Sequence, residues 1–137
     1  MSGKAFFDTN VLLYKYGSDA RKRTQATALF DEETQSANIL LSTQVVQEFY
    51  AAGSRKLGIP RSQLREVTLA LLDLPIIVVT AFHIARAIEN EQLYTISFWD
   101  ALILAAAESG GAEVLYTEDL NHGQKYGTVL VQNPFLD

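Results

Sequence analysis

Short apolar runs alternate with longer segments of helical spacing along the whole chain, and this alternation is the feature that most constrains the fold. The runs predict five strands, near residues 4–7, 38–42, 75–79, 113–116 and 128–131. The segments between them predict helices near 11–16, 20–33, 43–56, 60–72, 81–92 and 97–108. Strands that alternate with helices build a parallel sheet with both faces covered. We therefore expect a three-layer α/β/α fold with a five-stranded parallel sheet.

The length and composition predict one domain of an ordinary globular protein. The chain has 137 residues, which corresponds to a single domain spanning 1–137. No apolar run approaches the roughly 20 residues that cross a bilayer, and nothing before the first strand has the form of a signal peptide. The absence of cysteine excludes a disulfide framework and a thiolate metal site. We expect a cytoplasmic protein that does not enter a membrane.

The charge is unevenly distributed along the chain. The net charge of −5 argues against a general nucleic-acid binder. Residues 1–65 nevertheless hold nine Lys or Arg against six Asp or Glu, whereas residues 66–137 hold two against ten. A basic flank beside an acidic region suits a phosphate ligand that is held partly by cationic side chains and partly through a bound cation. Two solvated helix faces would produce the same distribution.

Two carboxylates follow predicted strands directly. Asp8 ends the first apolar run, and Asp119 lies just beyond the fourth. The carboxyl ends of parallel strands meet at one edge of the sheet, where ligands bind in open α/β folds. A structural role is also open for each, because Asp8 could cap the next helix and Asp119 could form a turn.

Two further carboxylates belong to helices that leave the same edge of the sheet. Glu48 has Val45, Ala51 and Ala52 as helical neighbours, so it lies at the edge of an apolar face. An ion pair with Arg55 or Lys56 is its structural alternative. Asp100 belongs to the helix predicted near residues 97–108. This helix is apolar on every side after its first turn, and Asp100 is the one charge in its run from 97 to 107.

A buried Asp100 would need a partner, since an unpaired carboxylate is unfavourable in an apolar interior. Ser97 and Asp100 also have the spacing of a capping box, which leaves a purely structural role open. Four carboxylates at one edge would repel one another unless a divalent cation lies among them. Oxygen ligands without cysteine favour Mg²⁺ or Mn²⁺ over Zn²⁺. Such an ion activates water and stabilises charge on a phosphoryl oxygen.

At these residues the sequence resembles the PIN-domain family of metal-dependent ribonucleases, and within it the VapC-type toxins of toxin–antitoxin pairs. Four segments in the family's order carry the resemblance, which covers essentially the whole chain. They are Phe7-Asp8-Thr9-Asn10-Val11-Leu12-Leu13-Tyr14, Gln44-Val45-Val46-Gln47-Glu48-Phe49-Tyr50, Ser97-Phe98-Trp99-Asp100-Ala101 and Leu115-Tyr116-Thr117-Glu118-Asp119-Leu120.

The resemblance implies the chemistry of the site. It implies a Mg²⁺ or Mn²⁺ site built from Asp8, Glu48, Asp100 and Asp119, and an RNA substrate that is single-stranded or structured. In that reading three aspartates hold the ion while Glu48 completes the shell and orients the attacking water. Asn10 and Thr117 match positions that support the acids by hydrogen bonding. Many relatives carry a further acid where this chain has Asn121, which leaves a second metal position open.

The resemblance also implies partners, namely a cognate antitoxin that covers the site and a homodimer. Candidate contacts to RNA phosphates or to an acidic partner segment are Arg21, Lys22, Arg23, Arg55 and Lys56. A solvated surface is the alternative for all of these basic residues. Phe98 and Trp99 are more typical of a core than of a base-stacking surface, and we expect them to pack inward.

Rival functions fit fewer of the acids. A haloacid-dehalogenase-type phosphatase would use Asp8 as a nucleophile after a strand, but its second acid is replaced here by Asn10, and Glu48 and Asp100 would have no role. A receiver-type signalling module would need an Asp after the third strand, where the chain has Thr80. A PIN-like domain that has lost activity and acts only through partners stays open as the main non-enzymatic alternative.

Overall fold

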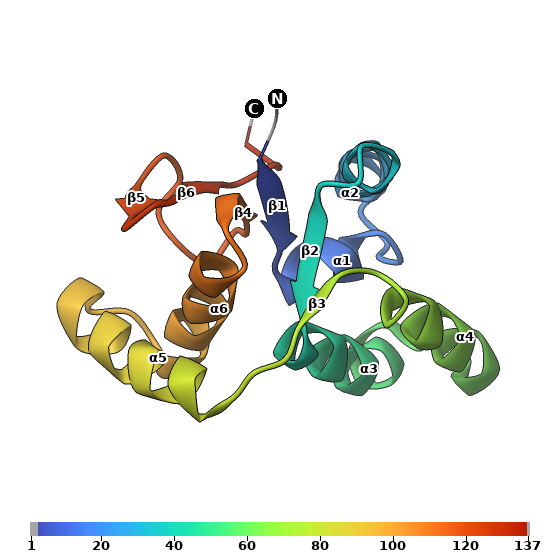
Figure 1. Ribbon diagram of the computed structural model, residues 1–137. Coiled ribbons are helices and arrows are strands. Elements are labelled where there is room, and N and C mark those ends of the chain that lie inside the picture. Colours follow the sequence, from blue (N-terminus) through green and yellow to red (C-terminus); the bar gives the residue numbers. More distant parts are fainter. Residues whose placement is uncertain (1–2, 137) are drawn as a thin grey trace.

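The computed structural model describes residues 3–136, which form a mostly parallel sheet between two layers of helices (Figure 1). The strands are β1 (Lys4–Phe7), β2 (Ile39–Ser42), β3 (Ile76–Ile77), β4 (Ala112–Tyr116), β5 (Lys125–Tyr126) and β6 (Val129–Gln132). The helices are α1 (Thr9–Tyr14), α2 (Ala20–Gln35), α3 (Thr43–Leu57), α4 (Arg61–Leu71), α5 (Ala81–Tyr94) and α6 (Phe98–Ser109). The predicted alternation of strands and helices is confirmed.

The sheet has the order β3-β2-β1-β4-β6-β5. All neighbouring strands are parallel except β5 and β6, which are antiparallel. Helices α1 to α4 pack together on one side, and α5 and α6 pair on the other, as Figure 1 shows. The chain leaves β1 towards β2 but leaves β4 towards β6. The strand order therefore reverses between β1 and β4, which is where open α/β folds bind ligands.

Local sequence explains where several of these elements begin. Ser42 and Ser97 accept hydrogen bonds from backbone amides in the first turns of α3 and α6, and Asp19 does the same for α2. Helix α3 ends at Gly58, whose φ of 64° lies in the left-handed region that favours glycine. Residues 101–107 of α6 are all buried, as its uniformly apolar sequence predicts.

The prediction of five parallel strands was wrong in one respect, because the segment expected to be a polar loop contains β5. This two-residue strand is too short to give a periodic pattern. It forms because Tyr126 is buried, with 2% of its surface exposed, and because Gly127 turns the chain back with a φ of 62°. The third strand is also shorter than expected, since Val78 is 62% exposed and lies outside β3.

The core lies between the sheet and both helical layers. Its largest fully buried side chains include Phe6, Phe7, Phe49, Leu115 and Tyr126. Phe7 and Leu115, near the carboxyl ends of β1 and β4, are thus tightly packed. This packing restricts the movement of the polar residues that follow these two strands. Within residues 3–136, no helix is both long and apolar enough to cross a membrane.

Candidate metal centre

The first part of the site is made where β1 and β4 end side by side. Their register pairs Phe7 with Tyr116, so the next residues along, Asp8 and Thr117, are neighbours. The Thr117 hydroxyl donates a 2.7 Å hydrogen bond to Asp8 Oδ2, and the Thr9 amide donates to Asp8 Oδ1 at 2.7 Å. Only 5% of Asp8 and none of Thr117 is exposed. Asp8 therefore both caps α1 and presents a carboxylate at the edge of the sheet.

Asp119 is held over the same edge by a small polar network. Its backbone amide donates to the Thr117 hydroxyl at 3.1 Å, and its Oδ2 accepts from Asn10 Nδ2 at 3.0 Å. Asn10 Nδ2 also lies 3.5 Å from Asp8 Oδ2 and 3.4 Å from Thr117 Oγ1. The two residues predicted to support the acids thus contact both Asp8 and Asp119.

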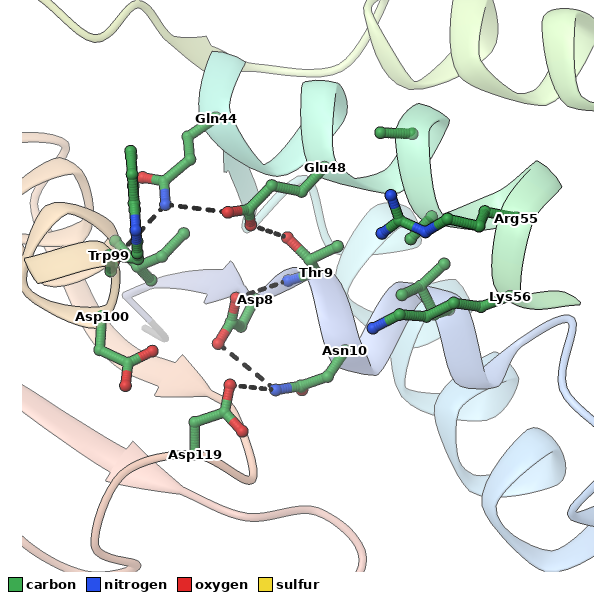
Figure 2. Close-up of a pocket in the computed structure, with 14 residues that line it drawn as sticks. Asp8, Thr9, Asn10, Gln44, Glu48, Arg55, Lys56, Trp99, Asp100 and Asp119 are labelled. Carbon is green, nitrogen blue, oxygen red and sulfur yellow. Dashed lines mark hydrogen bonds between the residues drawn. The ribbon is translucent and has the colours of Figure 1, made fainter. Parts of the chain in front are cut away.

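Asp100 reaches the site from the first turn of α6. Ser97 caps this turn by accepting a 3.1 Å hydrogen bond from the Asp100 backbone amide, as the spacing of Ser97 and Asp100 predicts. The carboxylate itself is half-buried rather than enclosed by apolar side chains. A hydrogen bond from Ser97 favours its ionised form. Its other near neighbours are acids, because Asp8, Asp100 and Asp119 each place a carboxylate oxygen within 4.8 Å of the other two (Figure 2).

Burial and mutual repulsion raise the pKa values of two of these acids, Asp8 and Asp100. Burial raises the pKa of Asp8 from 3.8 to about 7, and the nearby Asp119 and Asp100 push it upward, against the hydrogen bonds from Thr117 and Thr9. Burial also raises the pKa of Asp100, with further contributions from Asp119 and Glu48. These carboxyl groups therefore ionise less readily together than apart, and a positive charge among them would favour their ionised forms.

Glu48 lies in the same cavity but outside this group of three. It is the sixth residue of α3 and so belongs to the second turn rather than the first. Its carboxylate accepts from the Thr9 hydroxyl at 2.7 Å and from Gln44 Nε2 at 3.3 Å. No ion pair joins it to Arg55 or Lys56 among the described residues. The predicted structural ion pair is therefore absent there.

Gln44 was not predicted as a functional residue beyond its place in a motif. Its side-chain amide connects two helices, donating to Glu48 and, at 3.2 Å, to the backbone carbonyl of Trp99. The spacing of four residues between Gln44 and Glu48 was the available signal, because such residues face each other on a helix. The contact with Trp99 could not be seen without the tertiary structure.

These side chains surround a cavity of about 400 Å³. Its polar lining contains Asp8, Thr9, Asn10, Gln44, Glu48, Arg55, Lys56, Asp100 and Asp119. Figure 2 shows Arg55 and Lys56 reaching in from the C-terminal end of α3, on the side opposite Trp99 and Asp100. Both cationic side chains are exposed, and neither forms an ion pair within the described part of the chain.

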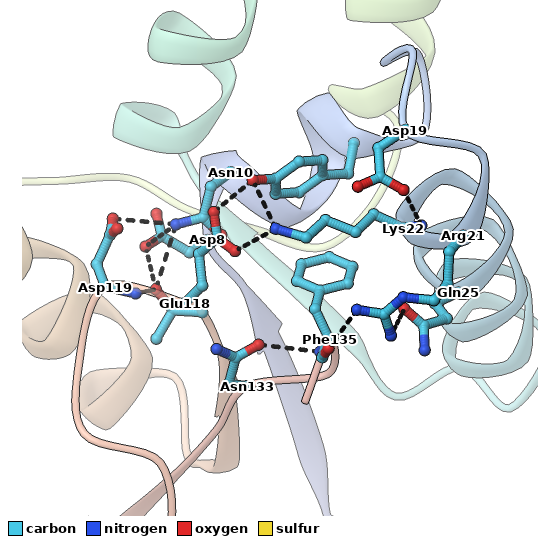
Figure 3. A network of polar contacts seen from close by, with 12 residues as sticks. Asp8, Asn10, Asp19, Arg21, Lys22, Gln25, Glu118, Asp119, Asn133 and Phe135 are labelled. Carbon is cyan, nitrogen blue, oxygen red and sulfur yellow. Dashed lines mark hydrogen bonds and ion pairs between the residues drawn. The ribbon is translucent and has the colours of Figure 1, made fainter. Parts of the chain in front are cut away.

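The basic triplet of Arg21, Lys22 and Arg23 lies away from this cavity. Lys22 Nζ lies 3.2 Å from Glu118 Oε2 and 3.1 Å from the Tyr14 hydroxyl, which itself donates to Glu118 at 2.6 Å (Figure 3). Arg21 donates to the Phe135 carbonyl at 3.1 Å and Arg23 to that of Gly17 at 2.8 Å. None of the three lines the acidic cavity.

The donor set fits a hard divalent cation. The three aspartates offer only oxygen atoms, which Mg²⁺ and Mn²⁺ prefer. The side-chain oxygens of Asn10 and Gln44 are also buried at this cavity, and neither accepts a hydrogen bond from any residue that the structure describes. Two acceptor oxygens at the cavity are thus left without a donor, and a cation with its bound water would satisfy them. Asn121 does not line this cavity.

The sequence matches the PIN domain family over residues 5–127. The chain belongs to the PIN domain family. A comparison with curated protein sequences found no match. Membership of the PIN domain family excludes the haloacid-dehalogenase alternative.

Solved structures of toxin–antitoxin proteins share the fold. The Mycobacterium tuberculosis toxin VapC20, described as cleaving the sarcin–ricin loop, has a TM-score of 0.67 at 18% identity, with 85% of this chain and 90% of that chain covered. A toxin–antitoxin complex from Klebsiella pneumoniae has a TM-score of 0.69 at 22% identity, with 96% and 98% covered. VapBC2 from Rickettsia felis, bound to a promoter DNA fragment, has a TM-score of 0.69 at 17% identity, with 94% and 97% covered. This PIN domain thus has the fold of VapC-type toxins along nearly its whole length.

Proposed function

We propose that this PIN domain is a metal-dependent endoribonuclease and the toxin of a type II toxin–antitoxin pair. The observation that carries the proposal is the convergence of Asp8, Asp100 and Asp119, whose oxygens lie within 4.8 Å of one another at the reversal of strand order. They come from three separate elements, and no structural need brings three carboxylates together. VapC20, which shares the fold, is described as a toxin that cleaves the sarcin–ricin loop.

In this proposal Asp8, Asp100 and Asp119 hold Mg²⁺ or Mn²⁺. Such an ion supplies an activated water and neutralises charge that develops on a phosphodiester oxygen. The chain contributes rigidity, because Thr117 and Asn10 fix the orientation of Asp8 and Asp119 through the hydrogen bonds described above. Outer hydrogen bonds of this kind orient metal ligands and maintain their basicity.

Glu48 has a separate role in the proposed reaction. Its carboxylate faces the cavity between Thr9 and Gln44, and these two donors hold it in one orientation. From there it completes the acidic shell and orients the attacking water. Arg55 and Lys56, on the far side of the cavity, are placed to bind the phosphates that flank the scissile bond.

The proposed partners are an antitoxin and a second copy of the chain. Structures that share the fold are toxin–antitoxin complexes, which supports an antitoxin as a partner. On α5, Ile84 and Ile88 lie one turn apart and are each 46% exposed, and Phe82 is 65% exposed. An apolar surface of this kind supports the homodimer. Light scattering at several concentrations measures the oligomeric state directly.

Cleavage of a mixed RNA pool by the purified protein tests the activity. We expect cutting in Mg²⁺ or Mn²⁺, none in EDTA, and none by Asp100→Asn. Asp73→Asn is the matched control, because Asp73 is an exposed acid that does not line the cavity. A folded wild-type protein that binds the metal but cuts no RNA would instead favour the inert, partner-binding alternative. Growth arrest on expression, relieved by the product of an adjacent gene, tests the toxin–antitoxin part.

A further inference from the structure

Trp99 is the one large aromatic side chain of the acidic cavity, and it is not in the core. Its surface is 63% exposed, contrary to the expectation that it packs inward. It immediately precedes Asp100 and lines the same cavity as Asp8 and Asp119. An indole left this exposed gains little from the hydrophobic effect in the free protein. Contact with a ligand in the cavity would bury the indole and gain this stabilisation.

The neighbours of Trp99 hold it in place without covering it. Its backbone carbonyl accepts the 3.2 Å hydrogen bond from Gln44, which fixes the start of α6 against α3. The Phe98 ring packs edge-on against the indole, with ring centroids 5.2 Å apart and planes at 77°. The indole N–H donates no hydrogen bond within residues 3–136. The backbone at Trp99 is thus anchored to α3, and most of the ring surface is free to contact a ligand.

Charges across the cavity indicate the chemistry of that ligand. Figure 2 shows Trp99 and Asp100 on one side of the cavity, Asp8 and Asp119 nearer its middle, and Arg55 and Lys56 on the other side. Cationic groups beside an aromatic surface are the combination that binds single-stranded nucleic acid, because phosphates contact the cations while a base stacks on the ring. A protein segment would need both an apolar and an acidic side chain to match this lining, whereas one nucleotide carries a base and a phosphate together.

We propose that Trp99 is the base-stacking residue of this nuclease and holds the nucleobase next to the scissile phosphate. The inference rests on the proposed function and names the residue that positions the substrate there. Stacking on Trp99 requires a base that is not already stacked within a duplex. The substrate therefore presents an unpaired nucleotide to the cavity, with its backbone directed towards Arg55 and Lys56.

The test uses the fact that Trp99 is the only tryptophan of the chain, so intrinsic fluorescence reports on this residue alone. The protein is titrated in EDTA with a short single-stranded RNA of mixed sequence. The comparison ligands are the same RNA annealed to its complement and an abasic ribose-phosphate chain of equal length. We expect quenching by the single strand, and little quenching by the duplex or by the abasic chain, which carries the same charge without bases.

Variants separate stacking from charge. Trp99→Ala should weaken single-stranded RNA binding roughly 5- to 150-fold, the range for loss of one stacked base, and should leave binding of the abasic chain unchanged. Trp99→Phe should retain most of the affinity, whereas Trp99→Leu, which is apolar without a π-face, should not. Arg55→Ala should weaken binding of both ligands. Mn²⁺ affinity of the Trp99 variants should equal that of the wild type, which shows that the site is intact.

Three results would overturn the inference. Equal RNA affinity of Trp99→Ala and the wild type, in a protein that cuts RNA, would refute the role of Trp99 and leave the nuclease standing. Conversion of a dimer to a monomer by Trp99→Ala, without loss of RNA affinity, would assign the indole to a protein interface. Failure of the wild type to bind or cut any RNA would remove the proposed function and this inference together.

Discussion

Thr117 and Asp8 are separated by 109 residues of chain, yet a 2.7 Å hydrogen bond joins them at the ends of two adjacent strands. The Thr117 hydroxyl also accepts from the Asp119 amide, so one oxygen atom orients two of the three clustered acids. Both contacts are remote from bulk water, because Thr117 has no exposed surface. The hydroxyl is therefore a structural centre of the site even though it is not one of its acids.

Thr117→Val, which keeps the shape and removes the hydroxyl, should destabilise the protein by about 1–3 kcal/mol, because a buried carboxylate loses a donor. It should also weaken Mn²⁺ binding, by roughly 10- to 100-fold if Thr117 behaves as an outer-shell partner. Urea denaturation and calorimetric titration measure the two effects. Thr117→Ser retains the hydroxyl and should bind Mn²⁺ nearly as well as the wild type. Equal losses in both variants would show that packing, rather than the hydrogen bond, is responsible.

The raised pKa of Asp8 predicts how the stability of the metal-free protein depends on pH. Because this pKa is about 7 in the folded state and 3.8 ordinarily, between these values the folded protein holds a proton that the unfolded chain has released. Stability should therefore fall as the pH rises from about 4 to about 7, by at most about 4 kcal/mol from this group. Above pH 7 its contribution should be constant.

Asp8→Asn removes that titration and should make the metal-free protein more stable than the wild type at pH 8. Denaturation curves in EDTA across the pH range measure the difference, with Asp73→Asn as the exposed control. Parallel curves for Asp8→Asn and the wild type would mean that Asp8 is ionised in the folded protein without a cation.

Mg²⁺ and Mn²⁺ should raise the melting temperature of the wild type, since a ligand that binds only the folded state stabilises that state. At a metal concentration one hundred times the dissociation constant, the free energy of unfolding should rise by about 2.7 kcal/mol. Asp100→Asn should abolish the increase. Glu48→Gln should reduce it less, because Glu48 lies outside the group of three and is held by Thr9 and Gln44. Scanning fluorimetry at increasing metal concentration distinguishes these cases. Equal effects of the two substitutions would place Glu48 among the direct ligands.

Lys22 and Arg55 should differ in their importance for RNA. Lys22 is engaged by Glu118 and Tyr14 outside the cavity, whereas Arg55 faces the cavity without an ion pair among the described residues. Lys22→Met should lower stability and leave RNA affinity nearly unchanged. Arg55→Met should lower RNA affinity and leave stability nearly unchanged. Binding measured at two salt concentrations provides the check, because loss of a phosphate contact reduces the salt dependence. A reduced salt dependence in Lys22→Met would restore the basic triplet as a phosphate contact.

The sequence by itself determined the succession of elements and the positions of the acids within them. Periodicity reports local backbone geometry, so strands such as Ala112–Tyr116 and the buried helix that begins at Phe98 could be predicted closely. It was insufficient for β5, whose two residues form a strand only because β6 lies beside them. Asp8 and Asp119 could be placed at one edge of the sheet because parallel strands share that edge.

Only the tertiary structure decided which of these residues meet. Strand order and register bring Asp8 beside Thr117, and the packing of α6 on the sheet brings Asp100 to both Asp8 and Asp119. The same packing leaves Trp99 exposed at the cavity. The pKa of Asp8 also belongs to this level, because desolvation depends on every neighbour that excludes water. A local pattern contains no information about distances between residues that are far apart in the chain, and those distances determine the chemistry of the site.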